Sequence, residues 1–187
     1  MKEYVVNLLG KGDGWQEIRN VKDGEIWGVN DSFLRIKCDK SFHMHDLNEF
    51  LKDPKTASST RLVIRNIEDG LHKDMKFYTT HKFKEIPSAI LYPLDEIVDR
   101  FNSNYFVSTI DYMIAYALYL GATKIRLFGI NMSVMNEEFY SQKPSAEFWL
   151  GLAMGMGVEI DTEFTKSSLF KIKDGHLYGY LIKQWKL

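Results

Sequence analysis

The sequence predicts an α/β fold in which a mostly parallel β-sheet is flanked by helices and followed by a C-terminal β-hairpin. Short apolar runs alternate with segments of helical periodicity, and the order helix, glycine, strand occurs twice in the C-terminal half. Strands that alternate with helices are typical of parallel sheets. The hairpin is predicted by the turn Lys173-Asp174-Gly175, which lies between two apolar runs within residues 169–182.

The N-terminal half is predicted to hold most of the strands. Most of them are short apolar runs that end at a glycine, aspartate or asparagine, which is the pattern of a buried strand followed by a turn. The predicted strands are residues 2–9, 25–30, 36–45, 61–67, 76–80 and 89–92. A short helix is expected over residues 46–51, and the polar run at residues 53–60 (DPKTASST) is expected to be a loop.

The C-terminal half carries clearer helix boundaries. Pro93 begins a helix, because the fixed φ of proline suits the first helical turn. A second helix is predicted over residues 107–120, whose apolar side chains share one face. Those side chains are Ile110, Met113, Ile114, Ala117 and Leu118. Residues 124–130 follow as a strand, Pro144 begins a third helix, and residues 158–160 form a short strand.

Length, charge and cysteine content exclude several classes of protein. The chain has 187 residues, one cysteine and a formal net charge of −1. A lone cysteine excludes a disulfide within the chain and a CxxC zinc site. The near-neutral charge gives no reason to expect nucleic-acid binding. The N-terminus does not resemble a secretory signal, and polar residues interrupt the longest apolar stretch, residues 105–122. We therefore expect a cytoplasmic protein without a membrane span.

The first candidate site is the turn Gly10-Lys11-Gly12-Asp13-Gly14, which follows the first strand. Ligands of parallel sheets bind beyond the carboxyl ends of the strands. Glycines there let backbone N–H groups approach a phosphate, and Lys11 adds a positive charge. Asp13 opposes a phosphate unless a cation intervenes, and the spacing is neither that of a dinucleotide turn nor that of a Walker loop. An ordinary tight turn is the alternative.

Two further segments carry polar groups where a ligand would bind. Asn30-Asp31-Ser32 follows the second strand, where an amide or acid contacts a ribose or base in dinucleotide folds. An Asx turn or a helix N-cap is the alternative, and it is preferred unless the first turn also binds a ligand. Ser108-Thr109 begins the long apolar helix, where two hydroxyls and free N–H groups suit an anion. Simple capping is the alternative for these two residues.

The segment His43-Met44-His45-Asp46 places two imidazoles on one face of a strand. Two imidazoles beside a carboxylate suit a metal ion. One histidine that is oriented by an aspartate suits a general base. No further histidine or cysteine follows at ligand spacing, so a structural zinc site is not expected. A polar strand end with one satisfied histidine is the alternative.

Two segments follow the predicted strand at residues 124–130. They are Gly129-Ile130-Asn131-Met132 and Tyr140-Ser141-Gln142-Lys143-Pro144. Tyr140 is a candidate to stack on a base or sugar, Gln142 to hydrogen-bond a ligand, and Lys143 to meet a phosphate. Glu147 lies one helical turn beyond Lys143, so an ion pair within the helix is the alternative for that lysine.

Several motifs follow one another in a specific order along most of the chain. They are Trp27-Gly28-Val29-Asn30-Asp31, Met44-His45-Asp46, Tyr105-Phe106-Val107-Ser108-Thr109, Leu127-Phe128-Gly129-Ile130-Asn131-Met132, Tyr140-Ser141-Gln142-Lys143-Pro144-Ser145-Ala146-Glu147-Phe148-Trp149, Leu169-Phe170 and Leu177-Tyr178-Gly179-Tyr180. In this order they resemble a group of uncharacterised Rossmann-like proteins that are common in bacteriophage genomes. The resemblance implies a single Rossmann-like nucleotide-binding domain over residues 1–187, in the cytoplasm of an infected host cell.

More distantly, the pattern is similar to bacterial sialyltransferases that use CMP-sialic acid, and to the related flagellin-modification proteins (motility accessory factors). They share the glycine turn, an asparagine after the second strand, a Ser/Thr-led helix and a strand that ends in Gly-Ile-Asp/Asn. The resemblance implies nucleotide contacts at Gly10, Gly12, Asn30, Ser108, Thr109, Gly129, Asn131 and Tyr140. Asp13-Gly14 replaces the family's Pro-Ser, which weakens the expectation of phosphate contact. His45 and His176 are the candidates for the catalytic histidine.

The leading hypothesis is a metal-free, glycosyltransferase-like enzyme that takes a nucleotide or CMP-sugar-like ligand. The ligand would be held by Gly10, Lys11, Gly12, Asn30, Ser108, Thr109, Gly129 and Asn131, with Tyr140, Gln142 and Lys143 at its diphosphate or sugar. His45, oriented by Asp46, would remove the acceptor proton. A non-catalytic protein that sequesters a host nucleotide is the second hypothesis. A structural protein with a sticky tail at residues 178–185 is the third. No membrane partner is expected, and a homo-oligomer is left open.

Overall fold

The computed structural model describes residues 3–132, 137–164 and 169–170. Its strands form one seven-stranded sheet in the order β5-β4-β3-β2-β1-β6-β7, and all six strand pairings are parallel. The strands are Val5–Leu9 (β1), Glu25–Val29 (β2), Lys40–His43 (β3), Lys76–Thr79 (β4), Ile90–Leu91 (β5), Lys124–Phe128 (β6) and Glu159–Asp161 (β7). The predicted parallel α/β fold is confirmed. The predicted C-terminal hairpin lies almost entirely outside the described residues.

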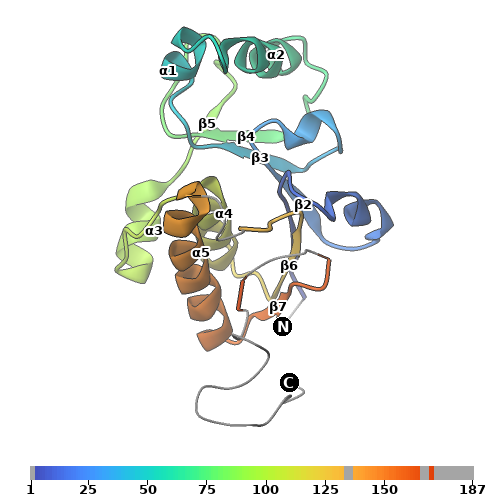
Figure 1. Ribbon diagram of the computed structural model, residues 1–187, viewed down its shortest axis with the longest axis vertical. Coiled ribbons are helices and arrows are strands. Elements are labelled where there is room, and N and C mark those ends of the chain that lie inside the picture. The colour runs from blue at the N-terminus through green and yellow to red at the C-terminus, as the bar shows by residue number, and fades with distance from the viewer. Residues whose placement is uncertain (1–2, 133–136, 165–168, 171–187) are drawn as a thin grey trace.

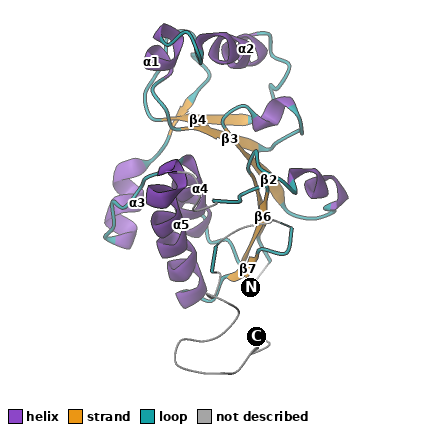
Figure 2. Cartoon of the chain, in the orientation of Figure 1, coloured by secondary structure: helices purple, strands orange, loops and turns teal. Residues whose placement is uncertain are grey.

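Helices cover both faces of this sheet. They are Leu47–Lys52 (α1), Ala57–Glu68 (α2), Leu94–Phe101 (α3), Thr109–Tyr119 (α4) and Glu137–Gly155 (α5), with 3₁₀ turns at Trp15–Asn20 (η1) and Ser32–Leu34 (η2). Figure 1 shows α3, α4 and α5 gathered on one side of the sheet, and Figure 2 separates these helices from the strands by colour. The other face is covered by residues of η1, η2, α1 and α2, which form a second apolar cluster. None of the described helices is long and apolar enough to cross a membrane.

Successive residues of β1 face opposite ways, so the strand contributes to both apolar clusters. Val6 and Leu8 pack in the cluster that includes α4 and α5, whereas Leu9 packs with η1, η2, α1 and α2. All three side chains are at most 1% exposed. A central strand that is buried on both faces explains why residues 5–9 are almost continuously apolar.

Two predicted elements differ from the structure. Residues 61–67 were expected to form a strand after a loop at residues 53–60, but they belong to α2, which begins at Ala57. The buried side chains of α2 include Thr60, Val63 and Ile64, a spacing that fits a helical period better than alternation. Its β-branched residues favour strands locally, and packing of one helical face on the sheet outweighs that preference.

Pro144 was expected to begin a helix, but it lies inside α5. A proline in this position removes one i to i−4 hydrogen bond, here the bond to the carbonyl of Tyr140. The helix nevertheless continues to Gly155, because residues 145, 146, 149 and 150 are all fully buried against the core. Tertiary packing therefore offsets the cost of the internal proline.

The topology determines where a ligand would bind. Within the sheet, β2 to β5 follow one another outward from one edge of β1, and β6 and β7 follow outward from its other edge. The connections that follow β1 and β6 therefore pass over opposite faces of the sheet, and α/β folds with this arrangement bind ligands at the carboxyl edge. The N-terminus of α4 lies at this same edge, because α4 runs back across the sheet into β6.

Candidate functional site

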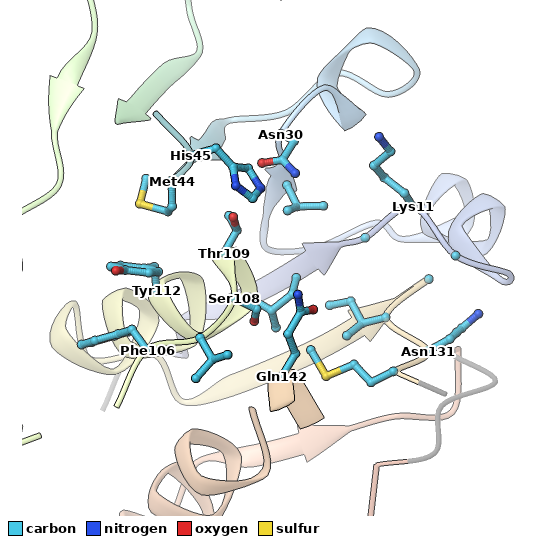
Figure 3. A pocket seen from close by; sticks show the side chains of 18 of the residues that line it. Lys11, Asn30, Met44, His45, Phe106, Ser108, Thr109, Tyr112, Asn131 and Gln142 are labelled. Atoms are coloured by element: carbon cyan, nitrogen blue, oxygen red, sulfur yellow. The ribbon is translucent and has the colours of Figure 1, made fainter. Parts of the chain in front are cut away.

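A cavity of about 630 Å³ lies at the carboxyl edge of the sheet, where β1, β2, β3 and β6 end beside the N-terminus of α4 (Figure 3). This volume suits a small organic ligand. Ten of the residues predicted from the sequence line it. They are Gly10, Lys11, Gly12, Asn30, His45, Ser108, Thr109, Gly129, Asn131 and Gln142. The fold thus brings together segments that are more than 100 residues apart in the chain.

Three predicted site residues do not line the cavity. Tyr140 is 76% exposed on the surface of α5. The Lys143 ammonium lies 3.6 Å from the Glu147 carboxylate, so the structure shows the intrahelical pair. The Asp46 carboxylate caps α1 by accepting a hydrogen bond of 2.8 Å from the Asn48 N–H.

The glycine turn after β1 packs closely against the turn after β6. The N–H groups of Gly10 and Gly12 donate to the carbonyls of Phe128 and Gly129, both at 2.8 Å. A Cβ atom on Gly12 would meet the Asn131 amide nitrogen at 2.7 Å and the Gly129 carbonyl oxygen at 2.9 Å. Both glycines are therefore required by the contact between the two turns, and the turn presents Lys11 between them to the cavity.

The Gly12→Ala substitution is expected to lower the free energy of unfolding by about 1–3 kcal/mol, because the added methyl group displaces Asn131 or the Gly129 carbonyl. The φ angle of Gly12 is not in the left-handed region, so alanine brings no backbone strain there and the substitution tests the steric contact alone. Chemical denaturation measures the effect. Gly151→Ala, on an open face of α5, is the matched control and should raise stability by up to about 1 kcal/mol. Equal effects of the two substitutions would contradict this account of the turn.

Buried side-chain oxygen atoms in the cavity lack a hydrogen-bond partner among the described residues, and two of them are Oδ1 of Asn30 and Oγ1 of Thr109. Asn30 directly follows β2 and has a left-handed φ of 52°, a conformation that asparagine tolerates better than most residues. Its N–H donates to the Phe42 carbonyl at 2.8 Å, which holds the residue in place. Because buried polar atoms are nearly always hydrogen-bonded, these two oxygens are available to a donor group that enters the cavity.

The N-terminus of α4 is organised by Asp111, one of the polar residues that interrupt the apolar stretch at residues 105–122 and not a predicted site residue. One Asp111 oxygen accepts hydrogen bonds from the N–H groups of Val107 and Ser108, both 2.7 Å, and from the Ser145 hydroxyl at 2.8 Å. Burial raises the pKa of Asp111, and these three donors oppose that shift. The sequence signal for this role of Asp111 is its position three residues after Ser108, which is the spacing of a capping box.

This arrangement leaves the first turn of α4 directed at the cavity. Thr109 and Ile110 both line the cavity. Their N–H groups lie in the first turn of α4, where no carbonyl group of the helix is placed to accept a hydrogen bond from them. Ser145 also donates to the Gln142 carbonyl at 2.9 Å, so one buried hydroxyl connects the helix terminus to the part of α5 that lines the cavity. A helix N-terminus with free N–H groups favours an anion.

The two predicted histidines differ sharply in environment. His45 is exposed at the cavity and stacks on Phe50, with ring centroids 4.6 Å apart. His43 is only 4% exposed, lies edge-on to His45 at 5.7 Å, and has no partner for either ring nitrogen among the described residues. Burial lowers the pKa of His43 to about 4. A search of the described residues finds no group of three or more His, Cys, Asp or Glu side chains that could hold a metal ion.

The cavity has two chemically different ends. Lys11 and Asn131 lie at one end, and Met44, Phe106 and Tyr112 gather at the other (Figure 3). The rings of Phe106 and Tyr112 are stacked with their centroids 4.5 Å apart. The sequence analysis did not identify these apolar lining residues, because their periodicity is that of ordinary core positions.

Two solved structures of the sialyltransferase CstII from Campylobacter jejuni are similar to the chain. The structure with the substrate analogue CMP-3FNeuAc has a TM-score of 0.55 and 14% identity, and the match covers 86% of this chain and 79% of that chain. The structure with cytidine-5'-monophosphate has a TM-score of 0.50 and 16% identity, covering 86% and 78%. No protein-family model and no curated protein matches the sequence. The chain therefore shares the α/β fold of a sialyltransferase whose structures hold CMP and a CMP-sugar analogue.

Proposed function

We propose that the cavity binds a CMP-linked sugar and that the protein transfers the sugar to an acceptor hydroxyl. The observation that carries this proposal is the convergence of ten sequence-predicted residues from six separate segments on one cavity. The cavity lies at the switch point where α/β proteins bind nucleotides. The fold likeness to CstII, whose structures contain CMP and a CMP-sugar analogue, supports the choice of nucleotide.

The charges of the cavity favour one phosphate over two. Its described lining carries one permanent cation, Lys11, and one carboxylate, Asp13. The Lys11 ammonium is already paired with the Asp31 carboxylate at 2.7 Å. A CMP-sugar has a single phosphodiester charge, whereas a sugar diphosphate brings two charges that this lining does not neutralise. The first turn of α4 supplies N–H groups for one anionic group.

The chemistry assigned to the cavity is a single displacement. The oxygen of the acceptor hydroxyl forms a bond to the anomeric carbon, while the bond from that carbon to the phosphate oxygen breaks. The electron pair leaves with CMP, and His45 takes the proton of the hydroxyl. Thr109 and Ile110 at the α4 N-terminus would stabilise the charge on the departing phosphate. The resemblance to bacteriophage proteins would place this reaction in an infected cell.

The proposal is tested by CMP binding and by the Asn30→Gly substitution. Glycine removes the unpartnered amide yet accepts the left-handed φ of this position. CMP at 100 times its Kd should raise the unfolding free energy by about 2.7 kcal/mol. Asn30→Gly should weaken CMP binding about ten-fold, measured by calorimetry. The Asn66→Gly variant on α2, which does not line the cavity, should bind CMP normally. Absence of CMP binding by the wild-type protein would overturn the proposal.

Nucleotide binding without transfer is the second candidate function. It is favoured by the positions of Tyr140 and Lys143, which were expected to stabilise the leaving phosphate and do not line the cavity. A sequestering protein needs the ligand cradle but no group that assists departure of CMP. Release of free CMP from CMP-sialic acid, followed by ³¹P NMR, distinguishes the two candidates: the transferase releases CMP in the presence of an acceptor, and the sequestering protein retains the intact sugar nucleotide.

A further inference from the structure

A second cleft, of about 430 Å³, lies away from the candidate site. It is formed by residues 33–38, which lead into β3, and by residues 70–75, which lead into β4. It therefore lies toward the amino ends of these strands, whereas the candidate site lies at carboxyl ends. The linings of the two cavities have no residue in common.

The lining of this cleft is predominantly basic. Arg35, Lys37 and Lys73 contribute positive charges, and Asp74 contributes the one carboxylate. All four residues are exposed, and none of the three cations forms an ion pair within the described part of the chain. The chain as a whole has a net charge of −1, so this concentration of cations is a local feature. Unpaired cations around a concave surface attract anions.

One end of the basic rim is held in place by an aromatic ring. The Arg35 guanidinium lies 5.6 Å from the centroid of the Trp15 ring, and the Arg19 guanidinium lies 5.1 Å from the same centroid. Stacking on an aromatic face restricts a long side chain and leaves the guanidinium N–H groups able to donate. The positive charge at this end is therefore partly preorganised.

The cleft also has an apolar floor. Phe33 and Cys38 are 1% and 3% exposed, and burial raises the pKa of the Cys38 thiol to about 12, so the thiol is neutral. The His72 ring packs edge-on against Phe33 with centroids 4.9 Å apart. Burial lowers the pKa of His72, so this ring offers hydrogen bonds without a charge at neutral pH. An apolar floor of this kind suits a ring or an alkyl chain. Simple inorganic anions such as phosphate have no such apolar part.

We propose that this cleft is a second ligand site, for a small organic anion with an apolar body. The apolar part packs on Phe33, and the anionic group meets Lys37 and Lys73. The volume is within the range of small-molecule pockets. Aromatic phosphate monoesters and aromatic carboxylates share this chemistry, and a comparison of one probe of each class separates them.

Phenyl phosphate is the probe, followed by ¹H–¹⁵N NMR of the full chain. It should cause saturable shifts of the backbone signals of residues 33–38 and 70–75. Inorganic phosphate has the charge without the ring, and phenol has the ring without the charge. Each should bind at least ten-fold more weakly than phenyl phosphate. Benzoate replaces the phosphate by a carboxylate, and its affinity relative to phenyl phosphate identifies the anionic group that the site prefers.

Matched variants locate the binding. Lys37→Gln/Lys73→Gln should weaken phenyl phosphate at least ten-fold without changing the thermal unfolding midpoint. The control, Lys55→Gln/Lys84→Gln, removes two other exposed lysines and should bind as the wild type does. Shifts confined to the carboxyl-edge cavity, equal affinity of the two double variants, or no saturable binding would each overturn the proposal. The measurement uses no CMP, so its outcome is independent of the function proposed above.

Discussion

Replacing His45 with alanine is expected to lower the rate of sugar transfer from CMP-sialic acid by about 10²–10⁴-fold while leaving the Kd for CMP within about two-fold. A positioned general base contributes rate enhancement of this size. His45 lines the cavity and is exposed, so an acceptor hydroxyl can reach its ring. Its stacking on Phe50 orients the ring. CMP release by ³¹P NMR gives the rate, and calorimetry gives the affinity.

Two further variants make the assignment of His45 specific. His45→Gln keeps hydrogen-bonding ability but cannot take a proton near neutral pH, so it should be as slow as His45→Ala. His81→Ala removes an exposed histidine that does not line the cavity and should leave transfer unchanged. If His45→Ala loses CMP affinity and transfer to the same extent, His45 binds the nucleotide and the assignment as base is wrong.

The central part of the fold could be predicted from sequence because its signals are local. β1, β2, β6 and α4 are each bounded by a glycine, an asparagine or a serine that ends or begins a regular element. Once the sheet is expected to be parallel, the carboxyl ends of all its strands share one edge. Residues as distant as Gly12 and Asn131 could then be assigned to one site without any knowledge of the contacts between them.

The remainder depends on contacts that the sequence does not encode locally. Asp111 is joined to Ser145, 34 residues later, by a buried hydrogen bond that no spacing rule predicts. Pro144 is normally a helix-start signal, but it lies inside α5, and the residues that follow it pack the helix against the core. Alternation along the strand predicted at residues 36–45 placed His43 and His45 on the same face, but β3 ends at His43. Which of the two rings is buried depends on α1, whose Phe50 packs against both.

The environment of His43 predicts that the protein loses stability in mild acid. The pKa of His43 is lowered from 6.5 to about 4, first because burial disfavours the charged ring, and also through unfavourable electrostatic interaction with His45 and Lys11. Asp31 acts in the opposite direction and does not compensate. Between these two pH values the unfolded chain binds a proton that the folded chain does not, so the free energy of unfolding falls as the pH falls.

The expected loss is about 3 kcal/mol between pH 7 and pH 4, since each unit of pKa difference corresponds to about 1.4 kcal/mol. The contribution is fully present above pH 6.5 and is lost progressively as the pH falls to about 4. His43→Phe removes the titrating ring and places a ring of similar shape among the same neighbours. The variant should therefore gain about 3 kcal/mol relative to the wild type over this interval, whatever its stability at pH 7.

Urea denaturation at half-unit steps from pH 7 to pH 4 measures this difference. His43→Leu is the second variant, in case the larger ring of phenylalanine strains its contact with Phe50. His72→Phe is the matched control, because His72 is more exposed and its removal should change the pH dependence much less. Parallel curves for the wild type and both His43 variants would show that His43 titrates as freely in the folded protein as in the unfolded chain. A flattened curve for both variants, beside a nearly unchanged curve for His72→Phe, assigns the acid sensitivity to His43, whose two ring nitrogens are buried without partners among the described residues.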